Sequence, residues 1–459
     1  MELFLLAASA SIITLIGVSA FLLITVKGSQ FNFSEKLAIG YGIGTGLITI
    51  EMLLISFLNI KFDIVTMLIP WLPIIIAGLF IFFRQTELPG PRLPAVKEEG
   101  VLRLFKTFLI SALSFEVAYT FFRALVKPIE SYDAIAIYAI KSKIFYLAKS
   151  VPQDFFQNIA FMFPHPDYPL NIPLAETFAY ILMGNINDQL VKLIFPLYYS
   201  AILVLFYFGL RRFASQLYSL LFTFILASVA QFNAFATNGY LDVPLAYYYF
   251  ASALFLFMWF EDIKRSYLLT LSAVMAGLAA WTKNEGLMYC AINSFLIFLF
   301  FILKNKKAKM RMFLHLLLYC AVIAVINIPW ILAKNKAHFV NTDIGSINLS
   351  PSNIIKQMHN IGIILYGYQR EFFGPKKWNM FWPVVFIVFI LYYRKALSGS
   401  GKYITTSLIL AIAGYTFFYL FSSVEVSYFV NKTWSRFLIH FLPVAVYWLA
   451  YMLKDDIKI

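Results

Sequence analysis

The sequence has little charge and almost no cysteine. Charged residues make up 13% of its 459 positions, whereas soluble domains carry about 25%. This shortage excludes both a soluble globular enzyme and a disordered chain, because each of these depends on a charged or polar surface. The two cysteines, Cys290 and Cys320, lie inside apolar runs, so neither a disulfide framework nor a cysteine metal site is expected.

Apolar and aromatic residues take the place of charge, at 61% and 19% of the chain. The hydrocarbon core of a membrane is about 30 Å thick, and a helix needs about 20 mostly apolar residues to cross it. The sequence divides into runs of about this size. We therefore predict an all-α, polytopic integral membrane protein with about thirteen transmembrane helices, at residues 3–26, 37–58, 63–83, 104–126, 190–210, 216–235, 242–260, 268–283, 286–303, 312–333, 379–393, 403–421 and 436–453.

Positive charge is in excess, with 37 Lys and Arg against 23 Asp and Glu, a net charge of +14. Much of it lies in short loops between the apolar runs, such as Arg211-Arg212 and Lys264-Arg265. Short basic loops face the cytoplasm, so we predict that the N-terminus is outside, in a multi-pass protein of a bacterial inner (plasma) membrane. The basic surplus sets the orientation and is not evidence for a nucleic-acid partner.

Two connections, 127–189 and 334–378, are long and face outward in this topology. Connections beyond about 12–15 residues are usually functional when ordered. In the first, Asp133 to Lys149 has neither Gly nor Pro and predicts a short interfacial helix, in which Lys141 and Lys143 contact lipid headgroups. A second short amphipathic stretch runs from about Leu174 to Met183.

A small set of ionisable residues, apart from those of the short basic loops, falls on the outward side of the membrane in this topology. An ionisable group at membrane depth costs about 2.5–3.5 kcal/mol, which makes it a functional candidate. The outward set consists of Asp133, His165 and Asp167 in the first long loop, Asp242 at the start of a span, Lys283 and Glu285 in a tight turn, and Arg436 at the start of the last span.

This sidedness constrains the chemistry, because nucleotide-activated substrates are made in the cytoplasm. An enzyme that works on the outer face needs a substrate delivered on a lipid. A polyprenyl-phosphate carrier presents an anionic phosphate that Lys and Arg at helix ends bind, and a tail that a groove between spans holds. The acceptor hydroxyl needs a general base, for which an outer-loop carboxylate is suitable.

Four short motifs, in this order and with this spacing, resemble the GT-C glycosyltransferase superfamily. They are Tyr132-Asp133-Ala134, Gly239-Tyr240-Leu241-Asp242-Val243-Pro244, Trp281-Thr282-Lys283-Asn284-Glu285-Gly286 and Ser435-Arg436-Phe437-Leu438. The likeness is to bacterial relatives of the protein O-mannosyltransferases and the lipid A aminoarabinose transferases. It covers about residues 104–453, a transmembrane catalytic core, whereas residues 1–103 resemble an added module of three spans and a cytoplasmic loop.

The resemblance implies an inverting transfer of a sugar from a polyprenyl-phosphate donor to a glycan, lipid or protein acceptor. It implies that Asp133 acts as the catalytic base, and that Lys283 and Arg436 bind the donor phosphate. Asp242 matches a second acidic position of the family, which implies an acceptor site or a divalent metal, Mg²⁺ or Mn²⁺. Glu285, His165 and Asp167 are further acceptor or metal candidates. The family's frequent second acidic residue after the loop aspartate is Ala134 here.

Each of these residues also has a structural explanation. Asp133 and Asp242 are each at a predicted helix start, where Asp is favoured as a cap without any function. Lys283 and Glu285 would form an ion pair that stabilises a tight turn. Two other functions stay open as well. One is an O-antigen polymerase or ligase, which would use Arg370, Lys376 and Lys377 of the late loop; the other is a transporter or flippase of lipid-linked saccharides.

Overall fold

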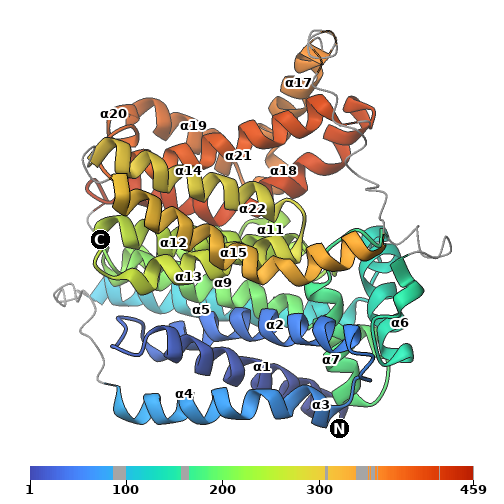
Figure 1. The fold of residues 1–459 in the computed structure, drawn as a ribbon. Coiled ribbons are helices and arrows are strands. Elements are labelled where there is room, and N and C mark those ends of the chain that lie inside the picture. The colour runs from blue at the N-terminus through green and yellow to red at the C-terminus, as the bar shows by residue number, and fades with distance from the viewer. Residues whose placement is uncertain are drawn as a thin grey trace.

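The computed structural model describes residues 1–85, 100–156, 165–304, 309–337, 350, 352, 357–358, 360–422 and 424–457. Parts of the two long predicted loops, 127–189 and 334–378, and most of the loop 84–103 therefore lie outside the described residues. Every element within the described ranges is a helix. The long helices lie side by side in one bundle, and short helices gather at one end of it (Figure 1).

Thirteen helical segments account for the bundle. Ten in the described part of the chain are long and apolar enough to cross a membrane, and three apolar helices are shorter. Each overlaps one of the thirteen predicted spans, although the span predicted at 216–235 is divided into α10 and the short α11 (Ala230–Phe235). They are α1 (Glu2–Ile24), α2 (Phe33–Phe57), α3–η1–α4 (Ile64–Leu68, Ile69–Trp71, Leu72–Arg84), α5 (Gly100–Val126), α8–α9 (Asp188–Val191, Ile194–Leu210), α10 (Gln216–Ala227), α12 (Asp242–Glu261), α13 (Ser266–Thr282), α14 (Gly286–Lys304), α15 (Lys309–Ala337), α19 (Phe381–Leu391), α21 (Gly401–Phe421) and α22 (Val426–Leu453).

The remaining described helices are short connections. They are η2 (Ala134–Ala139), α6 (Ile140–Ala148), η3 (Gln153–Phe156), α7 (Asn171–Met183), α11 (Ala230–Phe235), α17 (Ile361–Phe372), α18 (Pro375–Trp378) and α20 (Tyr393–Ala396). The predicted start of the last span differs from the structure, since α22 begins at Val426 rather than near 436. The polar residues Asn431, Lys432 and Thr433 hide this beginning from a hydropathy pattern, and Arg436 therefore lies within α22.

Helix α12 forms the centre of the bundle. Nearly all of its residues are buried, as expected of a helix that is apolar on every side. It contacts α13, α22 and α9. Two of its tyrosines form hydrogen bonds with the N-terminal helix α2. The Tyr247 hydroxyl donates to the Ala38 carbonyl at 2.6 Å, and the Tyr248 hydroxyl donates to the Gly42 carbonyl at 2.8 Å. The N-terminal helix α2 therefore packs directly against the centre of the molecule.

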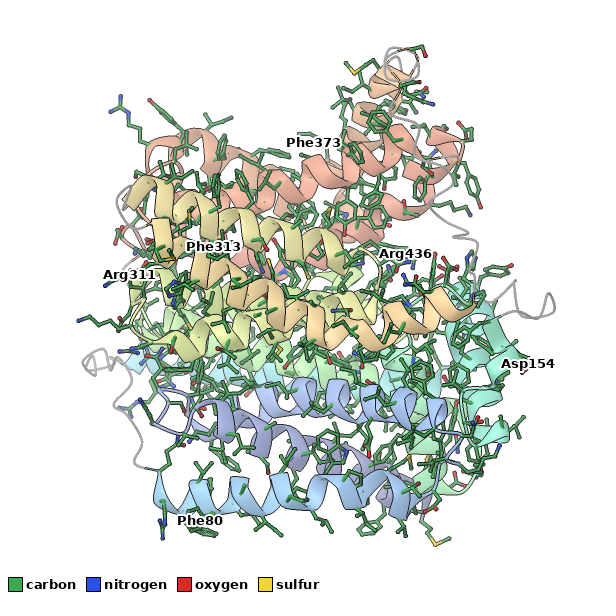
Figure 2. All side chains as sticks on the ribbon, in the orientation of Figure 1. Phe80, Asp154, Arg311, Phe313, Phe373 and Arg436 are labelled. Carbon is green, nitrogen blue, oxygen red and sulfur yellow. The ribbon has the colours of Figure 1, made fainter. Side chains whose placement is uncertain are left out.

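Large apolar side chains cover the outer surface of the bundle. Phe80 on α4 and Phe313 on α15 project outward in Figure 2 and are largely exposed, as are Phe83 and Phe108. Soluble monomers do not expose apolar surface on this scale. The distribution is that of a protein whose bundle is surrounded by lipid.

The short helices η2, α6 and α7 cover one end of the bundle (Figure 1). Helix α7 was expected to be amphipathic, but all of its residues except Leu182 are buried, since it packs among α1, α2 and α6. The N-terminus lies at the same end as these short helices, and the C-terminus lies at the opposite end. Arg436 lies toward the first end and Arg311 at the opposite end (Figure 2).

Candidate functional site

Five polar residues predicted from the sequence meet at the end of the bundle that η2 and α6 cover. Asp133 immediately precedes η2, Asp242 is the first residue of α12, and Lys283 and Glu285 form the turn between α13 and α14. The fifth residue, Arg436, projects from α22. They come from separate elements and form one continuous set of ion pairs.

Arg436 bridges the two aspartates. Its Nη1 atom lies 2.5 Å from Oδ2 of Asp133, and its Nε atom lies 3.4 Å from Oδ2 of Asp242. The ring of Tyr240 packs against the guanidinium, 4.4 Å from its central carbon, which is cation–π geometry. Asp133 makes no capping hydrogen bond to η2. Its carboxylate therefore pairs with Arg436 and does not cap the helix.

Asp242 is fully buried and accepts from three side chains. Besides Arg436, Lys283 Nζ lies 3.1 Å from its Oδ1 atom, and His440 Nε2 lies 2.6 Å from the same atom. A buried carboxylate is costly unless it is paired and hydrogen-bonded, and these groups meet that requirement. Asp242 is not an ordinary helix cap, because the residue at the cap position is Leu241.

Two glycines allow these elements to approach one another. Gly239, at φ +84°, precedes α12 in a conformation that other residues rarely adopt, and a Cβ there would lie 3.1 Å from the Cβ of Ala134. Gly239 thus lets the chain after Asp133 lie close to the chain before Asp242. A Cβ on Gly286 would lie 2.2 Å from the backbone of Ala279, so the tight turn that carries Lys283 and Glu285 requires glycine.

Glu285 completes the cluster. Its Oε1 atom lies 2.9 Å from Lys283 Nζ, so the pair that was expected to stabilise the turn is present, while Lys283 also reaches Asp242. Burial raises the pKa of the Glu285 carboxyl, but the Lys283 ammonium and other neighbours lower it by more than burial raises it. The pKa of Glu285 is therefore below its usual value. Glu285 is therefore an anion at neutral pH, and Lys283 lies between two carboxylates.

A cavity of about 710 Å³ opens onto the cluster. Its ionisable lining residues are Asp133, Asp167, Lys283, Glu285, Lys334 and Arg436. Its apolar lining residues belong to α14, α21 and α22, and they include Leu287, Met288, Phe417, Phe418, Phe421, Phe429 and Phe437. Such a cavity suits a ligand with an anionic or polar head and a hydrocarbon tail.

The first-loop candidates lie at different places. Asp167 is buried and lines the cavity together with Tyr168. His165 does not line it; its ring packs on Tyr168 at 5.0 Å and its carbonyl accepts from Lys141 Nζ at 2.7 Å. The headgroup role expected for Lys141 is wrong, because Lys141 is fully buried. Lys143 pairs with Asp188 at 2.5 Å and is partly exposed, so its headgroup contact stays a prediction.

Sequence reasoning missed a buried chain of hydrogen bonds behind the cluster. His440 contacts Asp242 through Nε2, while its Nδ1 atom lies 2.6 Å from the Tyr415 hydroxyl, which lies 2.9 Å from the Tyr289 hydroxyl. One signal could have found it: His440 follows Arg436 by four residues, so both side chains project from the same face of a helix. The tyrosines gave no signal in so aromatic a sequence.

The residues around Asp242 do not fit a divalent metal. The described residues contain no group of three or more His, Cys, Asp or Glu side chains in metal-binding arrangement. Lys283, Arg436 and His440 already surround the Asp242 carboxylate, and two of these neighbours are cations that would repel Mg²⁺ or Mn²⁺. No chemical step is therefore assigned to a metal here.

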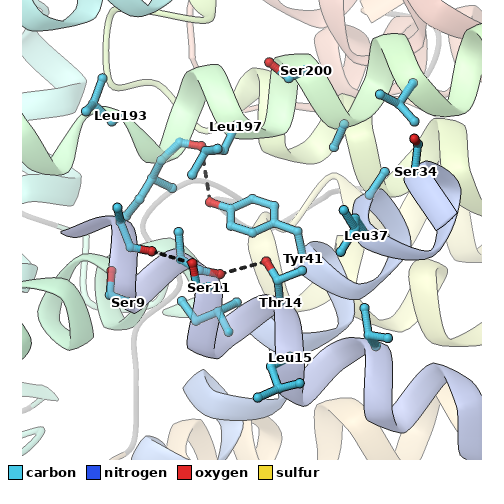
Figure 3. Close-up of a pocket in the computed structure, with 18 of the residues that line it drawn as sticks. Ser9, Ser11, Thr14, Leu15, Ser34, Leu37, Tyr41, Leu193, Leu197 and Ser200 are labelled. Atoms are coloured by element: carbon cyan, nitrogen blue, oxygen red, sulfur yellow. Dashed lines mark hydrogen bonds between the residues drawn. The ribbon is translucent and has the colours of Figure 1, made fainter. Parts of the chain in front are cut away.

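A second cavity, of about 1040 Å³, lies between the N-terminal helices and α9 (Figure 3). Its lining includes hydroxyl residues, but those of Ser9, Ser11, Thr14 and Ser200 donate to carbonyls of their own helices. These bonds leave a mainly apolar wall without charged residues. Of these two cavities, the one at the Asp133–Arg436 ion pair is therefore the one that charged side chains line.

No protein-family model matches the chain, and a search of the curated proteins gives no match. Among solved structures the chain is similar to ArnT from Cupriavidus metallidurans in the apo state, with a TM-score of 0.52 and 16% sequence identity over 77% of this chain. The chain therefore shares the fold of ArnT over the matched residues. The resemblance predicted from the sequence is thereby confirmed for the fold. This chain covers 60% of the ArnT chain, and the likeness carries no activity or substrate with it.

Proposed function

We propose that this protein is a membrane glycosyltransferase that moves a sugar from a polyprenyl-phosphate donor to a hydroxyl acceptor with inversion. The observation that carries the proposal is the ion-pair cluster of Asp133, Asp242, Lys283, Glu285 and Arg436, of which all but the buried Asp242 line a cavity that is otherwise largely apolar. The GT-C fold shared with ArnT supports it.

The two cations suit the donor phosphate. Lys283 and Arg436 are both held at the cavity surface by carboxylates, so their positions are set before a ligand arrives. Preorganised cations stabilise the charge that develops on a leaving phosphate. The apolar wall of α14, α21 and α22 suits the prenyl chain, since a hydrocarbon tail is favoured where it leaves water for apolar surface.

Asp133 suits the general base better than Asp242 does. The Asp133 side chain is 24% exposed and lines the cavity, whereas Asp242 is fully buried beneath its partners. In the proposed step the acceptor oxygen attacks the anomeric carbon as its proton passes to Asp133. The bond from that carbon to the phosphate oxygen breaks, and the phosphate leaves with the electron pair. Asp242 then has a positioning role, because it holds Arg436 and Lys283.

The test is sugar transfer by purified protein from a synthetic polyprenyl-phosphate sugar, with transfer followed by mass spectrometry. Asp133→Asn keeps the size of the side chain and removes the base, and we expect transfer to fall by about 10²–10⁴-fold without loss of folded protein. Asp154→Asn, an exposed aspartate of the same loop, is the matched control. Full activity of Asp133→Asn would remove Asp133 from catalysis.

The polymerase or ligase alternative places its chemistry on basic residues of the late loop. In the structure, Lys377 pairs with Glu371 at 3.0 Å, and Arg370 donates to Asn431 at 2.7 Å. Neither residue lines the cavity that holds Asp133 and Arg436. The contacts of the described late-loop residues therefore favour the glycosyltransferase proposal.

A further inference from the structure

A second group of polar residues lies beside Lys283, deep in the bundle. Thr49 of α2, Asn171 of α7 and Thr282 of α13 are all fully buried. None of the three lines the polar cavity. They join three helices that are far apart in the sequence, and Thr282 directly precedes Lys283.

The hydrogen bonds in this group form a consistent chain of donors and acceptors. The indole nitrogen of Trp281 donates to the Thr49 hydroxyl at 2.9 Å. The single proton of that hydroxyl has three acceptors in reach, of which Oδ1 of Asn171 at 2.7 Å is nearer than the Thr45 and Gly46 carbonyls at 2.9 and 3.0 Å. The amide nitrogen of Asn171 donates to the Thr282 hydroxyl at 2.8 Å, which donates to the Leu278 carbonyl at 2.7 Å. Each polar group is therefore satisfied, which is the condition under which buried networks make a structure rigid.

The hydrogen bonds of this group hold Trp281 and Thr282, the two residues that directly precede Lys283. Helix α13 ends at Thr282, and Lys283 continues with an extended backbone at φ −152°. Trp281 and Thr282 are bound through their side chains to Thr49 and Asn171, so the last turn of α13 is fixed from the side. The direction in which the polypeptide leaves α13 toward Lys283 is therefore fixed as well.

The same group connects the start of α12. The amide of Asn171 also donates to the Tyr248 hydroxyl at 3.4 Å, and Tyr248 donates to Gly42 of α2. Tyr248 lies less than two turns after Asp242 on α12. Helix α2 is thus joined to the last turn of α13, which precedes Lys283, and to the first turns of α12, which begins at Asp242.

We infer that Thr49 and Asn171 are positioning residues, which hold Lys283 where it meets the donor phosphate. The N-terminal helix α2 accordingly contributes to the site through Thr49. This inference rests on the proposed function for the role of Lys283, but the placement of Lys283 by Thr49 can be measured without any transfer reaction.

The experiment compares Thr49→Val, which keeps the shape and loses the hydroxyl, with Thr49→Ser, which keeps the hydroxyl. The first readout is modification of Lys283 by an amine-reactive reagent, quantified by peptide mass spectrometry in the full-length protein. We expect modification of Lys283 to rise about three- to tenfold in Thr49→Val, the change that loss of one buried hydrogen bond produces. Thr49→Ser should stay near the wild-type value.

The second readout is steady-state transfer. Thr49→Val should raise KM for the polyprenyl-phosphate sugar about three- to tenfold with a smaller change in kcat, and its effect should vanish in a Lys283→Gln background. Thr223→Val removes a comparable buried hydroxyl on α10 and is the matched control, for which no change is expected in either readout.

Unchanged modification of Lys283 in Thr49→Val would overturn the inference. An equal rise at Lys192, a fully buried lysine that does not line the cavity, would overturn it too, because that result would mean general loosening of the bundle. A rise at Lys283 alone, in a protein that transfers no sugar in any variant, would support the positioning by Thr49 and contradict the proposed function.

Discussion

Asp133 and Arg436 are 303 positions apart in the chain and form an ion pair of 2.5 Å at the cavity surface. The pair joins the first long loop to the last helix of the bundle. It also means that Arg436 is already engaged before a substrate binds. A donor phosphate that contacts Arg436 competes with Asp133 for the guanidinium, and the carboxylate it displaces is the group proposed as the base.

Replacement of Arg436 by Lys keeps the positive charge but removes the fork that reaches both aspartates. Arg and Lys are not equivalent where one side chain makes two directed contacts. We expect Arg436→Lys to lower kcat/KM for transfer roughly 10²-fold, as measured with the synthetic donor. Arg370→Lys, at an exposed hydrogen bond to Asn431, should retain activity; equal losses in both variants would contradict a specific role for Arg436.

Removal of Lys283 should destabilise the fold through Asp242. Loss of one partner of a buried ion pair costs about 3–5 kcal/mol, and Asp242 is fully buried. We expect Lys283→Met to lower the thermal unfolding temperature in detergent. Addition of Asp242→Asn should restore part of the loss, because the buried carboxylate that has lost its Lys283 partner is then replaced by a neutral amide.

The surface pair Lys377–Glu371 provides the comparison for that experiment. The Lys377 side chain is 47% exposed, and exposed pairs contribute about 0–1 kcal/mol. Lys377→Met should therefore change the unfolding temperature little. A double variant of Lys283 and Asp242 that is no more stable than Lys283→Met alone would show that the pair is not energetically coupled.

Chelation of divalent metals should leave transfer unchanged. This expectation follows from the three side chains that already surround the Asp242 carboxylate. The measurement is the initial rate of transfer before and after treatment with EDTA. A rate that is abolished by EDTA and restored by Mg²⁺ or Mn²⁺ would show instead that metal binding displaces Lys283 or His440.

Stability should fall as pH rises because of Glu176. This carboxyl is buried between α6 and α7, and burial raises its pKa from 4.5 to about 8, although the Ser142 hydroxyl and Lys143 act in the opposite direction and Asp188 adds to the rise. The folded state then binds one more proton than the unfolded state between pH 4.5 and about 8. The contribution of Glu176 is fully present below pH 4.5 and is lost as pH rises through about 8.

The Glu176→Gln variant tests this linkage. The amide can accept from Ser142 as the carboxyl does, and it has no proton to lose. Thermal unfolding measured from pH 5 to 9 should show a smaller decline for Glu176→Gln than for the wild type, by at most about 1.4 kcal/mol per pH unit. Parallel profiles for the two proteins would mean that Glu176 does not titrate in this range.

The bundle could be predicted from the sequence because hydrophobic length is a local property. Each predicted span overlaps an apolar helix of the structure. The start of α22 could not be predicted, since Asn431, Lys432 and Thr433 are polar and lie in the first turns of that helix. Their place in a helix follows from the capping of α22 by Glu425 and from contacts with neighbouring helices, neither of which hydropathy reports.

The site was predictable to the extent that charge in an apolar sequence is conspicuous. Asp133, Asp242, Lys283 and Arg436 were found in this way, but their pairing was not, because it depends on which helices are neighbours. His440 and Thr49 were missed for another reason. A neutral polar residue in a transmembrane helix has many structural explanations, and only its partners distinguish them.

The segment that follows Asp133, from Ala134 to Ala139, is a π-helix rather than an α-helix. Each hydrogen bond of a π-helix spans five residues instead of four, so this turn holds more chain than an α-helical turn would. The number of residues between Asp133 and α6 therefore helps to determine where the Asp133 carboxylate lies. A homologue that is shorter by a single residue in this segment would lose the wide turn, and its carboxylate would no longer face Arg436.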